Sequence, residues 1–353
     1  MPLSIGIVGL PNVGKSTLFN ALTKKQAEAS NYPFCTIDPN VGVVKVPDER
    51  LERLAEISEP KQIIPTIIEF TDIAGLVKGA HKGEGLGNKF LSHIRECDAI
   101  CEVVRNFENN DIIHVHNKID PEDDKSTINL ELIFADLETV GKRLEKVSKE
   151  AKRGDKVILK LEDILKRIKE SLENEKGARE VGLSDEEKLL IKDLNLLTLK
   201  PIIYVLNQEI KEIEIGKNWD GEILALNIKQ EEEIVSLGEA EQKEYIEELG
   251  LEQSGLDKLI KASYKLLGLL TFFTTGEDET RAWTVKIGAK APQAAGVIHT
   301  DFEKGFIRAE VINWKKFIES DGEVQAREKG LIRTEGKDYI MQDGDVCNFL
   351  VNK

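Results

Sequence analysis

Cysteine, methionine and aromatic residues are scarce in this chain of 353 residues, which has four cysteines, two methionines and 6% Phe, Trp and Tyr. Cys35 and Cys347 are isolated, and Cys97 and Cys101 are one helical turn apart, which is not the spacing of a zinc knuckle. This distribution argues against a disulfide framework. It predicts reduced thiols in a cytoplasmic protein.

Long apolar runs and excess positive charge are also missing. No segment approaches the roughly 20 apolar residues that cross a bilayer, and the first residues lack the basic stretch and cleavage site of a signal peptide. The formal net charge of -15 argues against sequence-indifferent binding to nucleic acid or to an anionic membrane. We therefore expect no membrane partner, although one domain could still carry a basic face.

The length predicts two or three domains. In the first third, apolar strands alternate with amphipathic helices, and a strand at 201–207 resumes the pattern; the expected strands are 3–9, 41–46, 63–72 and 99–104, and the helices 14–24 and 89–96. Such alternation is typical of an α/β fold with a mostly parallel sheet covered on both faces.

Between these parts, apolar residues recur at steps of three and four on both sides of a polar turn at 152–155. This spacing predicts an antiparallel helical hairpin, either a projecting arm or simply packed structure. From residue 276, glycines, tryptophans and short alternating strands indicate a small β-rich domain. The expected domains are a P-loop G domain (1–130 and 196–275), the inserted helical arm (131–195) and a last domain (276–353).

The strongest motif is Gly9-Leu-Pro-Asn-Val-Gly-Lys-Ser16, which fits the G-x-x-x-x-G-K-[ST] phosphate loop at every fixed position. Backbone N–H groups of such a loop converge on phosphates at a helix N-terminus. Lys15 would bridge the β- and γ-phosphates, and Ser16 would give its hydroxyl to Mg²⁺. The expected nucleotide-binding residues of this loop are Asn12, Val13, Gly14, Lys15, Ser16 and Thr17.

Three further residues suit the metal and the γ-phosphate. Asp72, in Asp72-Ile-Ala-Gly75, follows an apolar strand and can hold Mg²⁺ through water, while the Gly75 N–H senses the γ-phosphate. Thr36 could complete the metal shell when the triphosphate is bound. The expected Mg²⁺ residues are thus Ser16, Thr36 and Asp72. Since an asparagine at the place of Asn12 helps to bind K⁺ in some P-loop proteins, K⁺ is a second candidate cofactor.

Two strings compete for base recognition. Asn117-Lys-Ile-Asp120 spells the guanine-reading N-K-x-D, but too few residues precede it for the helix that a GTPase needs there. Asn207, at the end of the strand at 201–207, is the better candidate and is followed by Gln208. Ile210 stands where a guanine reader needs a carboxylate, so guanine loses its discriminating contact and adenine is favoured.

The catalytic group is not evident from the motifs. Leu76 follows the D-x-x-G motif, where Ras-type enzymes have a glutamine that orients the attacking water. Because leucine cannot orient water, we expect slow intrinsic hydrolysis. The histidines close enough in sequence to be considered are His81, His93, His114 and His116, although a lone histidine is more often a surface or packing residue.

Several long stretches resemble the Obg-like ATPase family of the YchF type, nearly end to end. They include residues 9–20, 31–42 and 83–91 and, outside the phosphate loop, Arg281-Ala-Trp-Thr-Val and the segment 291–309. The resemblance implies a G domain that prefers ATP, an inserted helical arm and a C-terminal TGS domain of β-grasp form. It also implies association with the ribosome through arm and TGS domain.

The resemblance further implies a catalytic substitute for the missing glutamine, namely a histidine that matches His114. One departure concerns the base loop, which reads N-x-x-E in the family. Here it reads Asn207-Gln-Glu-Ile, with the acid one position early. Backbone contacts to adenine around Gln208 can survive this shift.

Three functions remain open. The first is an ATP-hydrolysing switch on the ribosome, and the second is a GTPase of translation or ribosome assembly, if the string at 117–120 reads the base. The third is an RNA- or ribosome-binding adaptor with a structural nucleotide. Interleaved basic and aromatic residues motivate the adaptor, although strand alternation accounts for them equally well: Arg281, Trp283, Lys286, Lys304, Phe306, Arg308, Trp314, Lys315 and Lys316.

Overall fold

The structure, a computed structural model, describes residues 3–25, 40–73, 87–108, 119–209 and 219–352. These residues form two compact units. The C-terminal unit contains residues 43–68 and 257–352, and the N-terminal unit contains the other described residues. Within this described part, no helix is long and apolar enough to cross a membrane.

The N-terminal unit is built on a six-stranded sheet. β1 is parallel to β4 and β5, and β6 is parallel to β5 and β7. In spatial order the strands are β2 (Val41–Lys45), β4 (Ile67–Asp72), β1 (Ser4–Val8), β5 (Ala99–Asn106), β6 (Ile202–Gln208) and β7 (Glu222–Leu226). The predicted α/β class with a mostly parallel sheet is confirmed. Because the strands are parallel, the carboxyl ends of β1, β4 and β6 lie at one edge of the sheet.

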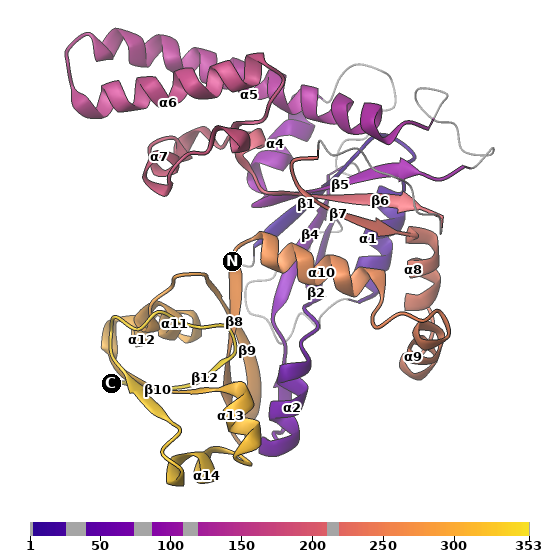
Figure 1. Cartoon of the computed structure of the whole chain (residues 1–353), viewed down its shortest axis with the longest axis vertical. Helices are drawn as coiled ribbons and strands as arrows, with labels where there is room; N and C mark the ends of the chain where they lie inside the picture. Colours follow the sequence, from indigo (N-terminus) through magenta and orange to yellow (C-terminus); the bar gives the residue numbers. More distant parts are fainter. Residues whose placement is uncertain (1–2, 26–39, 74–86, 109–118, 210–218, 353) are drawn as a thin grey trace. The chain divides into compact units, whose positions relative to one another are not determined.

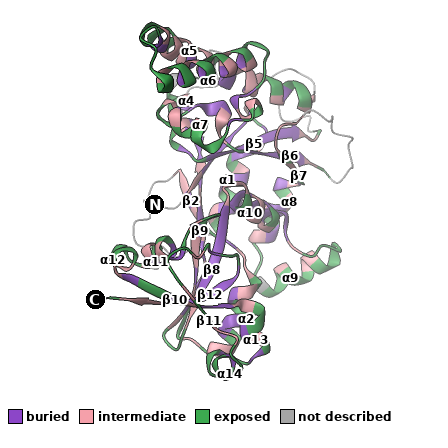
Figure 2. Ribbon diagram, turned by 60° about the vertical axis from the view of Figure 1, so that its left-hand side comes forward, coloured by how far each residue is buried: buried purple, intermediate pink, exposed green. Residues whose placement is uncertain are grey.

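Two helices of this unit, α1 and α4, match the helices predicted at 14–24 and 89–96. Nearly every residue of β5 and β6 is buried, as expected for strands in the middle of a parallel sheet (Figure 2). The flanking elements are α1 (Lys15–Lys24), α4 (Asn88–Glu96), α8 (Ile228–Val235), α9 (Glu239–Glu248), α7 (Asp185–Leu190) and the 3₁₀ turns η3 (Ala178–Val181), η4 (Lys192–Leu194) and η5 (Leu197–Leu199).

The predicted helical hairpin is confirmed by α5 (Pro121–Ala151) and α6 (Lys156–Glu173), which lie side by side in Figure 1. Their facing apolar side chains form a separate buried cluster. The Asp155 carboxylate caps α6 by accepting hydrogen bonds from two N–H groups. α5 begins before the expected boundary at residue 131, because Asp120 caps it, Pro121 suits its first turn and no breaker follows. One continuous helix therefore belongs to both the G domain and the arm.

The carboxylate of Asp136 ties α5 to the segment that leads back into the sheet. It is fully buried and accepts hydrogen bonds from Leu197 N at 3.0 Å, Thr198 N at 2.7 Å and Thr198 Oγ1 at 2.7 Å. Hydrogen bonds of this kind offset much of the free-energy cost of burying a carboxylate. The attachment of the arm thus depends on an acidic residue on the mostly apolar buried face of α5.

The C-terminal unit has a second six-stranded sheet, which is mixed. β12 lies between β10, to which it is antiparallel, and β8, to which it is parallel, and α11 packs on β9 and β10 as in a β-grasp fold. The strand order is β11 (Arg333–Glu335), β10 (Phe306–Asn313), β12 (Asp345–Val351), β8 (Leu269–Thr275), β9 (Glu279–Lys286) and β3 (Gln62–Ile64). The helices are α2 (Glu49–Ser58), most of α10 (Gly255–Leu266), α11 (Ala291–Ile298), α12 (Thr300–Gly305), α13 (Trp314–Glu319) and α14 (Glu323–Glu328).

The second sheet differs from the expected domain boundaries. β8, assigned above to the G domain, pairs antiparallel with β9, and the change of composition near residue 276 marks only the turn between these two strands. β3 pairs parallel with β9, and Leu51 and Leu54 of α2 pack with Phe273. The expected single strand at 63–72 is split, since Pro65 cannot donate to a ladder. Residues 43–68, which include the last residues of β2 and the first residues of β4, are therefore grouped with the C-terminal unit.

Candidate nucleotide-binding site

The phosphate loop lies between the end of β1 at Val8 and the start of α1 at Lys15. Gly9 has φ +143, and a Cβ there would stand 2.3 Å from the carbonyl oxygen of Val103. Gly14 has φ +105, and a Cβ there would meet Asn207 Nδ2 at 2.6 Å. Only glycine suits both positions, because other residues would be strained and would clash. The two glycines let the loop pass close to β5 and β6.

The first turn of α1 is open to an anion. No side chain caps it, and it contains no acidic residue. Its free N–H groups and the positive end of the helix dipole are therefore available to a phosphate group. Lys15, Ser16 and Thr17 form this turn, as predicted. Val13 is buried, so it can contribute only its backbone.

Lys15 is held inside the loop. The residue is 8% exposed, and its ammonium donates a hydrogen bond to the carbonyl oxygen of Leu10 at 2.5 Å. Burial lowers the pKa of Lys15 from 10.5 to about 8, and the nearby charge of Asp72 opposes this effect. Among the described residues, one carbonyl hydrogen bond and the nearby charge of Asp72 only partly offset the cost of burying this cation. It would gain strongly from a phosphate anion beside it.

Oxygen donors for a divalent cation also meet here. Ser16 Oγ lies 3.4 Å from Oδ2 of Asp72, which is 5% exposed at the end of β4. A hydroxyl and a carboxylate suit Mg²⁺, which prefers oxygen ligands. The chain thus brings together two of the three predicted metal residues from positions far apart in sequence.

Asn12 is exposed and has φ +62, a conformation that asparagine tolerates better than most residues. This geometry turns the loop before Val13. It is compatible with the predicted contact to a cation beside the phosphates, which stays a prediction.

Asn207 lies next to the phosphate loop, but its side chain is already engaged. Its Nδ2 donates to the carbonyl oxygen of Val13 at 3.0 Å, and its Oδ1 accepts from the N–H of Ile228 at 3.2 Å. Both atoms of the amide therefore connect β6, the loop and the start of α8. The arrangement supports a bracing role for Asn207. Sequence reasoning missed it because Ile228 carries no motif.

Gln208 pairs with another residue that the sequence did not single out. Asn106 Nδ2, at the end of β5, donates to Gln208 Oε1 at 3.1 Å. The neighbouring strands β5 and β6 are in register at this pair. The only signal in the sequence was an amide at the end of each apolar strand.

A second buried acid, Glu231 of α8, was also missed. Its two carboxylate oxygens accept from the N–H groups of Gly255 at 2.8 Å and Leu256 at 3.1 Å. Glu231 thereby fixes the start of α10 against the helix that Asn207 also anchors. Glu231 therefore stabilises the site indirectly, through α8.

Several predicted residues lie outside the described residues. They are Thr36, Gly75, Leu76, His114, His81, His116 and Ile210, together with Asn117 of the rejected guanine string. Asp120, the last residue of that string, is described: its carboxylate accepts from the N–H of Asp123 and caps α5. His93, in α4, forms an ion pair with Glu96 at 3.7 Å when it is protonated.

Comparisons with known proteins agree with this geometry. A family model described as a 50S ribosome-binding GTPase matches residues 4–150, and the C-terminal YchF-GTPase model, described as a protein of unknown function, matches residues 269–352. Two proteins named ribosome-binding ATPase YchF, from Bacillus subtilis and Haemophilus influenzae, are 55% and 54% identical, with 100% of both chains covered.

A solved structure is also similar over its whole length. The structure of the Schizosaccharomyces pombe YchF GTPase is 40% identical and has a TM-score of 0.90, covering 99% of this chain and 97% of that one. Together with full-length identity above one half, this similarity includes both units. The chain belongs to the YchF family.

Proposed function

We propose that this protein binds and hydrolyses ATP with Mg²⁺ and that it acts on the ribosome in the cytoplasm. The observation that carries the proposal is the phosphate loop, in which the uncapped α1, buried Lys15 and the Ser16–Asp72 pair converge. Relatives that cover the full chain are named ribosome-binding ATPase YchF, which supports both the nucleotide and the partner.

In this proposal Lys15 leaves the Leu10 carbonyl and contacts the β- and γ-phosphates. Its charge then stabilises the negative charge that builds up on the transferred phosphoryl group. The bound Mg²⁺ would be held through Ser16, Thr36 and Asp72 and would neutralise phosphate charge. The N–H groups of residues 12–17 and of Gly75 bind the phosphate oxygens, and His114 orients the attacking water. K⁺ beside Asn12 is part of the same proposal.

The preference for ATP rests on the base loop. Because the amide of Asn207 is engaged with Val13 and Ile228, recognition of the base falls to the chain after Gln208. There Ile210 stands where a guanine reader has its carboxylate, and Glu209 is one position early. The alternative is a GTPase, the activity by which the fission-yeast relative is named.

The experiment is equilibrium binding of ATP and GTP to nucleotide-free protein with Mg²⁺, followed by turnover. We expect ATP to bind tighter by about tenfold or more, which is roughly 1.4 kcal/mol. Tighter GTP would assign the protein to the GTPases. Loss of binding in Lys15→Ala, with an unchanged thermal midpoint, would locate the site in the loop.

An RNA contact through the C-terminal unit and the arm is the second candidate. It is favoured by Arg281, whose guanidinium lies 4.0 Å from the ring centroid of half-buried Trp283. The guanidinium offers a positive charge to the phosphates of single-stranded RNA, while the Trp283 ring stacks on Phe272 at 6.4 Å. Phe306, by contrast, is buried in the core and offers no surface. Ribosome co-sedimentation of Lys15→Ala that stays equal with and without ATP would favour this adaptor function over the switch.

A further inference from the structure

α4 belongs to the connection that crosses from one edge of the first sheet to the other. β4 ends at Asp72 and β5 begins at Ala99, and both strands are parallel to β1, so the chain between them must return to the amino edge. Asp98, just after α4, donates its N–H to the carbonyl oxygen of Ser4 at 2.8 Å, where β1 begins. The C-terminal end of α4 therefore lies at the amino edge of the sheet, away from the phosphate loop.

This end of α4 is held by Lys200, which stands just before β6. The ammonium of Lys200 donates to the carbonyl oxygen of Arg95 at 3.0 Å and to that of Cys97. A cation on the last carbonyl groups of a helix satisfies their unpaired oxygens and suits the helix dipole. The start of α4 lacks such a contact, because no side chain caps the helix at Gly87. Within the described residues, α4 is thus anchored by side chains at its C-terminal end.

Arg95, in the last turn of α4, extends this anchor to the arm. Its guanidinium donates to the carbonyl oxygen of Asn195 at 3.0 Å, in the segment that returns from the arm, and to Oγ1 of Thr139 in α5 at 3.2 Å. The carbonyl oxygen of Leu194 lies at 3.4 Å and Oδ1 of Asp136 at 3.9 Å. One side chain therefore connects α4 to both chain passes at the root of the arm.

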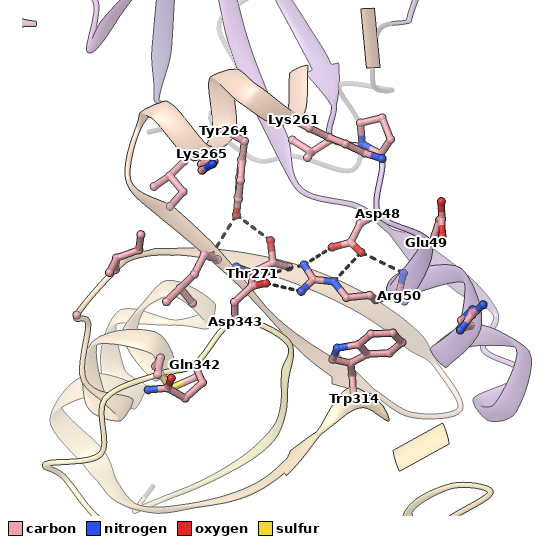
Figure 3. Close-up of a pocket in the computed structure, with 18 of the residues that line it drawn as sticks. Asp48, Glu49, Arg50, Lys261, Tyr264, Lys265, Thr271, Trp314, Gln342 and Asp343 are labelled. Atoms are coloured by element: carbon pink, nitrogen blue, oxygen red, sulfur yellow. Dashed lines mark hydrogen bonds and ion pairs between the residues drawn. The ribbon is translucent and has the colours of Figure 1, made fainter. Parts of the chain in front are cut away.

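The closest partners of Arg95 are neutral, unlike those of Arg50 in the C-terminal unit (Figure 3). Arg50 donates to Asp48 at 2.7 Å and to Asp343 at 2.6 Å, so two carboxylates hold it. Pairs of arginine with carboxylate are among the strong hydrogen bonds of proteins. The side chain of Arg95 is 28% exposed and can exchange its neutral partners for water. Its connection to the arm can therefore be rearranged more readily than the Arg50 network.

A cavity of about 590 Å³ beside Arg95 leaves room for such a rearrangement. It lies between α4 and α5, and Leu91, Ser92 and Thr139 line it together with Arg95. Phe134 of α5, which also lines the cavity, is 62% exposed. Near Arg95 the two helices are thus separated by open space and not by close-packed side chains. The guanidinium is a polar bridge across this space.

From these contacts we propose that Arg95 is a positioning residue that couples the nucleotide site to the arm. The inference rests on the proposed function, in which the segment after Asp72 contacts the γ-phosphate. When that contact forms or is lost, α4 shifts, and Arg95 carries the shift to Thr139 of α5 and to Asn195 of the returning segment. Because the arm is attached through these two passes, it takes one position with ATP and another with ADP. α4 is the element whose position both sites influence.

The test measures the position of the arm in the full chain. Spin labels are introduced as non-canonical amino acids at exposed Glu150, near the turn of the arm, and at exposed Glu222, in β7 of the sheet. The distance between the labels is measured with Mg²⁺ and either a non-hydrolysable ATP analogue or ADP. We expect the mean distances to differ by about 2 Å or more, since helix shifts of about 1–2 Å are enlarged along the arm.

Arg95→Met removes the polar bridge and keeps an unbranched side chain. It should reduce the difference between the two states to less than about 1 Å, while the affinity for the ATP analogue changes by less than about threefold. Arg95→Lys and Thr139→Val each keep part of the contacts and should give intermediate differences. We expect these variants to fold, because Asp136 retains both hydrogen bonds from Thr198.

The matched control is Arg167→Met. Arg167 also forms an ion pair, with Glu187 at 2.7 Å, but this pair connects α6 to α7 and does not include α4. The control should leave the distance difference unchanged, and thermal midpoints check the fold of every variant. The inference is overturned if the unmodified protein shows the same distance in both states or if Arg95→Met keeps the difference. Titration of the unmodified protein with the ATP analogue separates two failures: binding without a distance change rejects only the coupling, whereas absence of binding rejects the proposed function as well.

Discussion

Replacing Asn207 with alanine tests whether this residue braces the phosphate loop or recognises the base. The substitution removes two buried hydrogen bonds, those that the Asn207 amide makes with the Val13 carbonyl and the Ile228 N–H. An unsatisfied buried group costs about 1–3 kcal/mol, so the two groups together cost about 2–6 kcal/mol. If this cost falls on the nucleotide-bound loop, affinity drops by at least roughly 30-fold and by up to roughly 20,000-fold.

Because the Asn207 side chain does not contact the base in this role, the affinities for ATP and for GTP should fall by the same factor. The assay is equilibrium binding of both nucleotides with Mg²⁺, with thermal unfolding measured in parallel. Asn207→Asp should be equally damaging: it keeps the acceptor for Ile228 but places a carboxylate against the Val13 carbonyl. Gln208→Ala is the control, since it removes one partly buried hydrogen bond to Asn106, worth about 1 kcal/mol.

Two results would refute the bracing role. The first is an ATP affinity within about threefold of the unmodified protein, which corresponds to less than 1 kcal/mol. The second is a change in the ratio of ATP to GTP affinity by about tenfold or more, because only a direct contact with the base changes that ratio.

Three further predictions concern the loop, its surroundings and a buried acid. Burial lowers the pKa of Lys15 to about 8, and ATP binding needs the charged form of this side chain. Above pH 8 the lysine must therefore take up a proton before ATP binds, so ATP affinity should fall about tenfold from pH 7 to pH 9. Lys15→Arg should show no such fall. Gly9→Ala should abolish nucleotide binding and lower the thermal midpoint, because Gly9 has φ +143 and its new Cβ would stand 2.3 Å from the Val103 carbonyl oxygen. The control is Gly154→Ala, at φ +78 with nothing within 4 Å, which should cost only about 1 kcal/mol of stability. Equal thermal midpoints for the two variants would contradict the close approach of Gly9 to Val103. Glu102 of β5 is buried with both carboxylate oxygens lacking a hydrogen-bond partner in the described structure, and burial raises its pKa well above 4.5. The folded state then holds a proton that the unfolded state releases, so stability falls as pH rises above about 4.5, and Glu102→Gln should raise the thermal midpoint more at pH 8 than at pH 5.

The sequence by itself determined the elements whose signals are local. The phosphate loop needs a few residues at fixed spacing, and Gly9, Gly14, Lys15 and Ser16 stand where that spacing puts them. The arm needs only a heptad-like apolar pattern and a capped turn, which the chain provides around Asp155. Such patterns can be recognised in the sequence because the interactions that cause each element lie within one or two helical turns of the chain.

The tertiary structure alone decided which distant residues meet. The bond from Asn207 to Ile228, the pairing of β3 with β9 and the anchoring of α5 by Asp136 join segments without any shared periodicity. The change of composition at residue 276 suggested a domain boundary, but backbone pairing placed β8 with β9. Pairing partners are selected by burial and hydrogen-bond satisfaction over the whole fold, and no short window of sequence contains that information.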